Sequence, residues 1–159
     1  MAKHSIRLPG FDYRHPGPYF LTLVVDRRRP ILATRQDHSL TLSPAGRIVE
    51  EEWQLLATRR PGIQLDEFVV MPDHFHAIIL LPDSSAMPAP KGHSELYRPP
   101  KSLGAIVAQF KAGTTRRINA IQGTGGTPLW QRNYYEHIVR NAHSLSRIRR
   151  YIQENPIRP

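Results

Sequence analysis

The sequence predicts one α+β domain in which helices pack on an antiparallel β-sheet. Runs of β-branched and aromatic residues at 19–26, 63–71 and 74–81 are typical of strands, while apolar residues at helical spacing follow Ser43 and Ser102. The 159 residues suffice for one domain with a core and are too few for two comfortable ones. The predicted order is strand, helix, strand, strand, helix, strand, helix. This is the order of a ferredoxin-like split βαβ sheet, here with an added C-terminal helix.

The first half of the chain supplies an arm, a strand and a helix before the histidine-bearing strand. Residues 1–18 are polar and rich in turn residues, so we expect an N-terminal arm before the strand at 19–26. Ser43 and Pro44 are typical of an N-cap and a first helical residue. Apolar residues at helical spacing give this helix one buried face, and three acidic residues lie on the opposite side: Glu50, Glu51 and Glu52.

The second half begins with a segment that cannot join the core. Residues 82–100 contain five prolines, which predicts an exposed loop before the second helix. Residues 130–140 are expected to form the last strand and its approach. A final helix over 145–155 follows, for which either Asn141 or Ser144 can serve as the N-cap.

Charge and cysteine content narrow the function classes. Residues 1–90 hold 10 basic and 10 acidic side chains, whereas residues 91–159 hold 12 basic and 3 acidic ones. This asymmetry favours a polyanionic partner such as nucleic acid, although a basic face that serves only solubility would look the same. The absence of cysteine excludes disulfides and zinc thiolate sites. With no long apolar run and no signal peptide pattern, we expect a cytoplasmic protein.

Two histidines in the third predicted strand are candidate metal ligands. His74 and His76 are two residues apart, so they point to the same face of a strand and can both reach one divalent ion. The alternative is that one is an ordinary core residue and the other caps a turn. On the last helix, Tyr151 and Asn155 are four residues apart and therefore lie side by side. An Asn oxygen suits a hard ion such as Mg²⁺ or Mn²⁺, but Tyr151 could equally pack at the rim of the core.

Several motifs together resemble those of a known family. They are Met-Pro-Asp-His-Phe-His at 71–76, the run Trp-Gln-Arg-Asn-Tyr-Tyr-Glu-His-Ile-Val-Arg-Asn at 130–141, and Tyr-Ile-Gln-Glu-Asn-Pro at 151–156. In this order they resemble the REP-associated tyrosine transposases, relatives of the single-tyrosine HUH transposases of the IS200 type. The resemblance implies a ferredoxin-like fold and Mg²⁺ or Mn²⁺ held by the metal ligands His74, His76 and Asn155. It also implies that Tyr151 is the catalytic nucleophile.

The function implied by the resemblance is a metal-dependent single-stranded DNA transesterase. Such an enzyme nicks and rejoins DNA next to short palindromic hairpins through a 5′-phosphotyrosine, as a monomer or a homodimer and without a membrane. A second possibility is a hairpin DNA- or RNA-binding protein that keeps the fold but does not cut. A third is a hydrolase that uses water and leaves Tyr151 as a bystander.

Basic residues of the second half are the candidate DNA contacts, and we expect most of them to position the backbone without reading bases. The tyrosines Tyr134 and Tyr135 alternate along a strand, so at most one shares a face with the histidines, and we assign them to packing or base stacking. His137 is expected to be structural. The candidate DNA-binding residues are Arg98, Lys101, Lys111, Arg116, Arg117, Arg132, Arg140, Arg147, Arg149 and Arg150.

Overall fold

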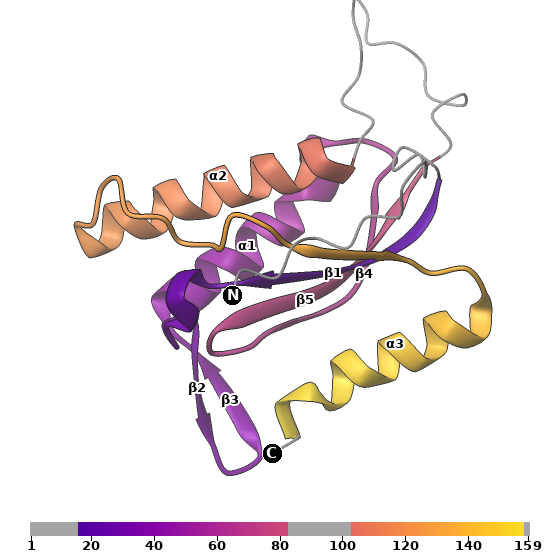
Figure 1. Ribbon diagram of the computed structural model, residues 1–159, viewed down its shortest axis with the longest axis horizontal. Coiled ribbons are helices and arrows are strands. Elements are labelled where there is room, and N and C mark those ends of the chain that lie inside the picture. Colours follow the sequence, from indigo (N-terminus) through magenta and orange to yellow (C-terminus); the bar gives the residue numbers. More distant parts are fainter. Residues whose placement is uncertain (1–15, 83–102, 158–159) are drawn as a thin grey trace, which may run out of the picture.

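The computed structural model describes residues 16–82 and 103–157. Its centre is a four-stranded antiparallel sheet in the order β4 (Gln64–Val70), β5 (His74–Leu81), β1 (Gly17–Val24) and β6 (Tyr135–Ile138). One face of the sheet carries two helices and the other face carries one (Figure 1): α1 (Pro44–Arg59) and α2 (Leu103–Gln122) against α3 (Ala142–Glu154). The predicted α+β class and the split βαβ order with an added C-terminal helix are confirmed.

The main core lies between the sheet and the helices α1 and α2. On the central strand β1, Tyr19, Leu21 and Leu23 are at most 1% exposed, and they belong to this core. The side chains between them point to the opposite face, because successive residues of a strand alternate. Trp53 of α1 packs edge-on against Phe75 of β5, with ring centroids 5.2 Å apart. The side chains on the second face of the sheet therefore do not join the main core.

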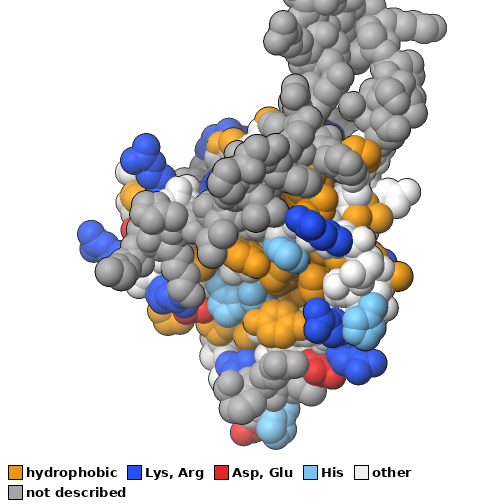
Figure 2. Space-filling view, turned by 45° about the vertical axis from the view of Figure 1, so that its right-hand side comes forward, with side chains coloured by type: hydrophobic (Ala, Val, Ile, Leu, Met, Phe, Trp, Pro, Cys, Tyr) orange, Lys and Arg blue, Asp and Glu red, His pale blue; other side chains and the backbone are white. Residues whose placement is uncertain are grey.

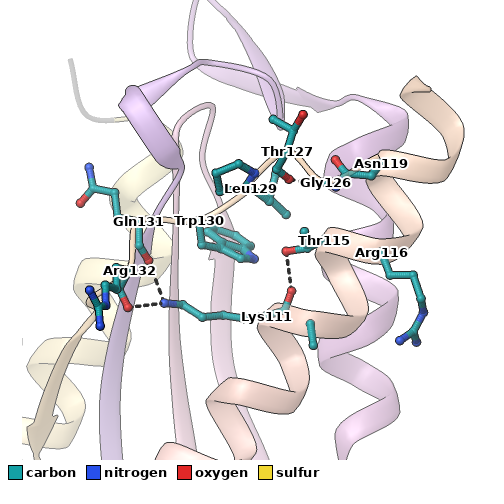
Figure 3. Close-up of a pocket in the computed structure, with 12 residues that line it drawn as sticks. Lys111, Thr115, Arg116, Asn119, Gly126, Thr127, Leu129, Trp130, Gln131 and Arg132 are labelled. Atoms are coloured by element: carbon teal, nitrogen blue, oxygen red, sulfur yellow. Dashed lines mark hydrogen bonds between the residues drawn. The ribbon is translucent and has the colours of Figure 1, made fainter. Parts of the chain in front are cut away.

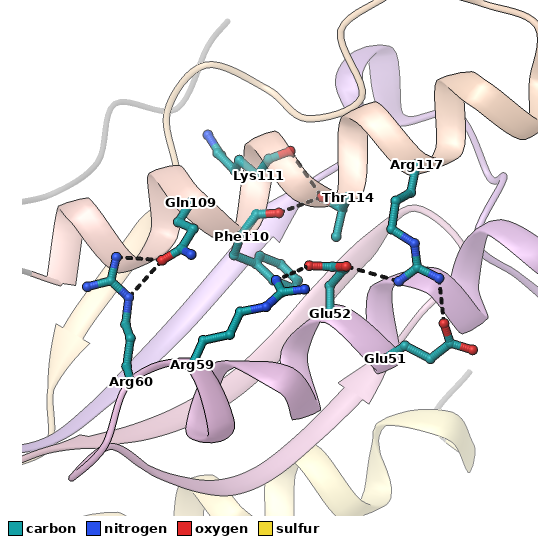
Figure 4. A network of polar contacts seen from close by, with 9 residues as sticks. All are labelled: Glu51, Glu52, Arg59, Arg60, Gln109, Phe110, Lys111, Thr114 and Arg117. Carbon is teal, nitrogen blue, oxygen red and sulfur yellow. Dashed lines mark hydrogen bonds and ion pairs between the residues drawn. The ribbon is translucent and has the colours of Figure 1, made fainter.

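Helix α1 begins where the sequence predicts, but it buries an acidic side chain that the sequence places on the solvent side. The backbone N–H of Gly46 donates to Ser43 Oγ at 3.1 Å, which confirms Ser43 as the N-cap. Glu52, expected on the solvent side, is only 4% exposed. It accepts hydrogen bonds from Arg59 at 2.8 Å and from Arg117 of α2 at 3.0 Å (Figure 4). The prediction was wrong here because α2 packs across this side of α1 and covers it.

Ion pairing keeps the buried Glu52 carboxylate charged. Burial raises its pKa, but the hydrogen bonds from Arg59 and Arg117 outweigh burial and the pKa is lowered overall. Arg117 also pairs with Glu51 at 2.6 Å. A Cβ added at Gly113 would come within 2.9 Å of Glu52 Oε2, so glycine lets the two helices approach without displacing this carboxylate. This network fixes α2 on α1.

Helix α3 lies on the second face of the sheet and is held there mainly by one buried residue and one ion pair. Asn141 is its N-cap, accepting from the N–H of Ser144 at 2.8 Å. Ile152 is 1% exposed, while Leu145 and Ile148, at helical spacing from it, are only partly buried. Arg149 donates twice to Asp66 of β4, at 2.8 and 2.6 Å. The helix is thus anchored chiefly over β4.

A hairpin that the sequence did not predict projects beside the end of α3 (Figure 1). It consists of β2 (Ala33–Gln36) and β3 (Ser39–Leu42), and the turn residue Asp37 has φ of +54°. Four-residue strands with mixed polar and apolar side chains give too weak a periodic signal to be recognised. The short turn η1 (Asp26–Arg28) precedes the hairpin.

Two boundaries also differ from prediction, and parts of the chain lie outside the described residues. The strand expected at 19–26 begins at Gly17, within the predicted arm, and β6 is shorter than 130–140. Trp130 instead joins Val25 through an isolated bridge. Residues 1–15 of the predicted arm and nearly all of the proline-rich loop lie outside the described residues. Within residues 16–82 and 103–157, no helix is both long and apolar enough to cross a membrane.

Candidate active site

Two histidines stand side by side on the face of the sheet that the main core leaves free. The register of β5 with β1 places His76 opposite Thr22 and His74 opposite Val24. The two imidazole ring centroids are 4.7 Å apart. His76 is buried, with 6% of its surface exposed, and His74 is partly buried. The alternation of a strand therefore brings both rings to one place, as predicted.

One ring nitrogen of each histidine has a hydrogen-bond partner. Nδ1 of His74 lies 2.7 Å from Oδ1 of Asp73, and because a carboxylate only accepts, this nitrogen donates. Nδ1 of His76 lies 2.8 Å from Oγ1 of Thr22. When Nδ1 carries the proton in a neutral ring, Nε2 keeps the lone pair that a metal binds. The Asp73 carboxylate therefore leaves Nε2 of His74 free for ligation, and the Thr22 hydroxyl, which can donate or accept, allows the same tautomer in His76.

The donor set fits a divalent cation. Burial lowers the pKa of His76 to about 3, and the neighbouring His74 adds to the shift, so His76 is neutral at physiological pH. Neutral imidazole is the ligating form. No group of three His, Cys, Asp or Glu side chains that could hold a metal occurs in the described ranges. Further ligands to an ion on His74 and His76 would therefore be amide, hydroxyl or water oxygens, which Mg²⁺ and Mn²⁺ accept.

Tyr151 of α3 meets the histidine pair at a cavity of about 730 Å³. Its ring centroid is 5.4 Å from that of His76 and 6.3 Å from that of Phe20, and 38% of its surface is exposed. The cavity is lined by three of the four predicted site residues, His74, His76 and Tyr151. Its other lining residues are Thr22, Val24, Arg28, Gln131, Asn133, Tyr134 and Tyr135. Elements far apart in the sequence thus bring the predicted nucleophile to two predicted ligands.

Asn155 lies one helical turn beyond Tyr151, at the C-terminal cap of α3 and the start of the 3-10 turn η3 (Asn155–Ile157). It is 7% exposed. Its backbone N–H donates to the carbonyl of Ile152, and its own carbonyl accepts from Nη2 of Arg35 at 2.9 Å. Asn155 is not one of the residues that line the cavity. Its role as third ligand stays a prediction.

One curated protein is similar to this chain over nearly its whole length. No family model matches the sequence. An uncharacterized protein of Haemophilus influenzae (strain Rd) is 34% identical over 161 residues, which cover 98% of this chain and 88% of that protein. The chain belongs to the same family as this protein.

Solved structures share the fold at lower identity. A REP-associated tyrosine transposase bound to a REP hairpin superposes with a TM-score of 0.66 at 20% identity, covering 96% of this chain and 73% of that one. A protein of Deinococcus radiodurans R1 described as a transposase gives a TM-score of 0.52 at 20% identity, over 92% and 95% of the two chains. The fold is that of a REP-associated tyrosine transposase. The resemblance drawn from the sequence motifs is confirmed at the level of the fold.

In this transposase fold the predicted DNA-contacting cations divide into two groups. Arg117 and Arg149 are bound to carboxylates of Glu51, Glu52 and Asp66. Lys111 donates to the carbonyl oxygens of Gln131 and Arg132. Five others have no ion-pair partner in the described part of the chain: Arg116, Arg132, Arg140, Arg147 and Arg150. Arg98 and Lys101 lie outside the described residues.

Lys111 anchors the segment that leads into β6 (Figure 3). Its ammonium donates to the carbonyl oxygens of Gln131 at 2.8 Å and Arg132 at 3.0 Å. Burial lowers the pKa of Lys111. A second cavity, of about 560 Å³, lies between α2 and residues 126–132 and includes Arg116 and Arg132 in its lining. Lys111 thus makes its hydrogen bonds within the protein. The candidate DNA contacts that remain among the described residues are the five arginines without an ion-pair partner.

Sequence reasoning missed the residues that surround the histidines from other strands. Thr22 could not be recognised as the partner of His76 without knowing that β1 pairs with β5. Tyr135 shares the histidine face, whereas the hydroxyl of Tyr134 donates to Glu136 at 3.1 Å. Tyr134, which lies just before β6, nevertheless also lines the cavity, so both tyrosines border the site although only Tyr135 lies on the strand face of the histidines. His137, expected to be structural, is exposed on the same face as Tyr135.

Proposed function

We propose that this chain is a metal-dependent transesterase that cuts and rejoins single-stranded DNA beside short hairpins. The observation that carries the proposal is that Tyr151, His74 and His76 line one cavity in a chain with the fold of a REP-associated tyrosine transposase. The solved transposase of that fold is bound to a REP hairpin. A hairpin with a single-stranded flank is therefore the substrate to expect here.

The proposed reaction exchanges one phosphoester bond for another. Oη of Tyr151 forms a bond to the scissile phosphorus, and the bond between that phosphorus and the 3′ oxygen breaks. The phenolic proton is released, and the 3′ oxygen takes up a proton to become a free hydroxyl. The 5′ phosphate remains on Tyr151. The reverse attack by a 3′-hydroxyl rejoins the strand, so no nucleotide triphosphate is consumed.

The residues around the cavity orient the reacting groups. His74 and His76 would hold Mg²⁺ or Mn²⁺ through Nε2, and a bound ion would polarise the scissile phosphate. Asp73 and Thr22 fix the orientation of the two imidazoles through Nδ1. Arg28, half-exposed at the cavity and 3.7 Å from Asp73, adds positive charge where the phosphate would lie.

A denaturant-resistant protein–DNA adduct tests the proposal. The protein is incubated with hairpin-flanked single-stranded oligonucleotides from its own genome and Mn²⁺ or Mg²⁺. We expect an adduct that is lost with chelator and lost in Tyr151→Phe, while Tyr135→Phe, another tyrosine at the cavity, retains it. Binding without any adduct over the whole oligonucleotide set would instead support a hairpin-binding protein that does not cut. Cleavage without an adduct would support a hydrolase.

A further inference from the structure

The strand register places a second aromatic side chain in line with the histidine site. Thr22 of β1 pairs with His76 on one side and with Tyr135 of β6 on the other. Paired residues of neighbouring strands point to the same face, so His76, Thr22 and Tyr135 form one row across three strands. Since strands lie about 4.8 Å apart, the backbones of His76 and Tyr135 are about 10 Å apart. Both side chains line the same cavity.

Tyr135 is presented as an open aromatic surface. It is 39% exposed, and it lies on β6, the outermost strand at that edge of the sheet. His137 stands beside it, with ring centroids 6.4 Å apart and planes only 15° from parallel. Phe20 contacts Tyr135 edge-on at 6.2 Å and also contacts the rings of His76 and Tyr151. The nucleophile and the edge-strand ring are therefore packed against a common residue.

A phosphodiester held near His76 and Tyr151 would have its attached nucleotides within reach of this row. Unpaired bases stack on aromatic side chains, and removal of one such contact weakens single-strand binding by about 5- to 140-fold. A paired base cannot offer its face in this way, because its neighbours in the duplex already cover it. An exposed ring beside the scissile position therefore favours a flank that is single-stranded.

We propose that Tyr135, backed by His137, is the stacking platform for an unpaired base next to the scissile phosphate. This rests on the proposed function and adds to it a binding site for one flanking nucleobase. The ring of Tyr135, not its hydroxyl, makes the contact. The site selects single-stranded over duplex DNA at that nucleotide and accepts any base, because every base has a stacking face.

The test is a coupling measurement between the ring and the base. Affinity is measured by fluorescence anisotropy in the Tyr151→Phe background, which cannot form the proposed adduct, with hairpin oligonucleotides carrying a single abasic residue at each flanking position in turn. At one position we expect base removal to weaken binding at least 5-fold with Tyr135 or Tyr135→Phe. With Tyr135→Leu, the same base removal should have no further effect. Ile121→Ala, which removes an exposed apolar side chain from α2, is the matched control. In this variant, base removal should weaken binding as much as in the parent protein that keeps Tyr135.

The outcomes separate this inference from the proposed function. If base removal weakens binding by Tyr135→Leu as much as by the parent at every position, the platform is not Tyr135. Thermal unfolding of Tyr135→Leu checks that the variant is folded, and a loss of affinity for every oligonucleotide without coupling would also overturn the inference. Absence of an adduct with the wild-type protein would overturn the transesterase but leave the binding measurement valid.

Discussion

At the scale of single residues, the hydrogen bond between Thr22 and His76 is the contact most directly tied to the candidate metal site. It lies between two strands, and it uses the nitrogen that a metal ligand would leave free. Outer hydrogen bonds of this kind fix the tautomer and orientation of a metal-binding ring. The arrangement would also keep a buried His76 in place in the absence of an ion.

Substitution of Thr22 tests this role without removing a ligand. Valine keeps the branched shape of threonine but cannot hydrogen-bond to Nδ1, so in Thr22→Val we expect metal affinity to fall about 10- to 100-fold. The measurement is the Mn²⁺ concentration that half-saturates adduct formation, together with Mn²⁺ binding followed by electron paramagnetic resonance. Thr34→Val, at an exposed position of β2, is the control. An unchanged Mn²⁺ requirement in Thr22→Val would contradict the role.

At the scale of elements, α3 carries the nucleophile but has little buried surface of its own. Among its described residues only Ile152 is buried in full, so polar contacts at two points do much of the anchoring. Arg149 binds Asp66 of β4, and Arg35 of the β2–β3 hairpin binds the carbonyl of Asn155. The position of Tyr151 therefore depends on contacts with residues distant from the cavity.

The bond from Arg35 predicts a specific effect of the hairpin on the end of α3. A hydrogen bond from a charged donor contributes roughly 1.5–3 kcal/mol, so Arg35→Gln should destabilise the last turn of α3 by up to about that amount. We expect amide exchange at residues 153–157 to accelerate about 10-fold or more, and adduct formation to slow while hairpin affinity is kept. Ser39→Ala removes a hydrogen bond of the same hairpin and serves as control. Equal exchange in both variants would contradict the prediction.

The ion pair between Arg149 and Asp66 predicts an acid-sensitive contribution to stability. The hydrogen bonds from Arg149 hold the pKa of Asp66 below its usual value, although partial burial opposes them. Because the folded pKa is the lower one, the stabilisation is complete above the unfolded pKa and is lost as pH falls through the folded pKa. Arg149 is 40% exposed, so screening limits the effect to about 1 kcal/mol or less.

Urea unfolding of Asp66→Asn measures this contribution. The variant should unfold at a lower urea concentration than the wild type at pH 7, and the difference should shrink as pH falls below about 4, where free aspartate takes up its proton. Asp37→Asn, in the turn of the β2–β3 hairpin, is the matched control and should follow the wild type. A difference that persists unchanged in acid would show that the ion pair is not its source.

The elements also show what the sequence can and cannot predict. Local signals sufficed for the start of α1 at Ser43 and for the common face of His74 and His76, and they narrowed the N-cap of α3 to Asn141 or Ser144, because each depends only on residues close in the chain. The burial of Glu52 depends on where α2 crosses α1. The row from His76 to Tyr135 depends on strand order and register, which no local pattern carries.

At the scale of the whole molecule, the basic residues of the second half are of two kinds: some bind groups within the fold, and others have no such partner. Arg117 and Arg149 neutralise carboxylates and Lys111 binds backbone carbonyls, so they stabilise the fold. Figure 2 shows Lys and Arg side chains on the same face as histidine and hydrophobic side chains. Only the cations without such partners are available to neutralise phosphates. A count of basic residues alone cannot make this division.

The division predicts that two kinds of arginine substitution differ in their salt dependence. Each lost phosphate contact reduces the slope of log affinity against log salt by about 0.7 on single strands and 0.9 on duplex. Arg116 and Arg132 line the second cavity and have no ion-pair partner among the described residues. Changing both to Gln should therefore lower the slope by about 1.4–1.8 and weaken binding equally for every DNA sequence.

Arg117→Gln is the matched comparison, because it removes the same charge from the same helix. It leaves Glu51 without this partner and the buried Glu52 with Arg59 alone, so we expect a lower unfolding midpoint and a nearly unchanged salt slope. The measurement is hairpin affinity at several salt concentrations from about 50 to about 200 mM. Its salt slope separates arginines that contact phosphate from arginines that pair within the fold. A salt slope that falls as much in Arg117→Gln as in a single Arg116→Gln variant would show that pairing within the fold does not decide which cations meet DNA. Sequence preference lost at constant affinity in the Arg116 and Arg132 variants would show instead that these residues read bases.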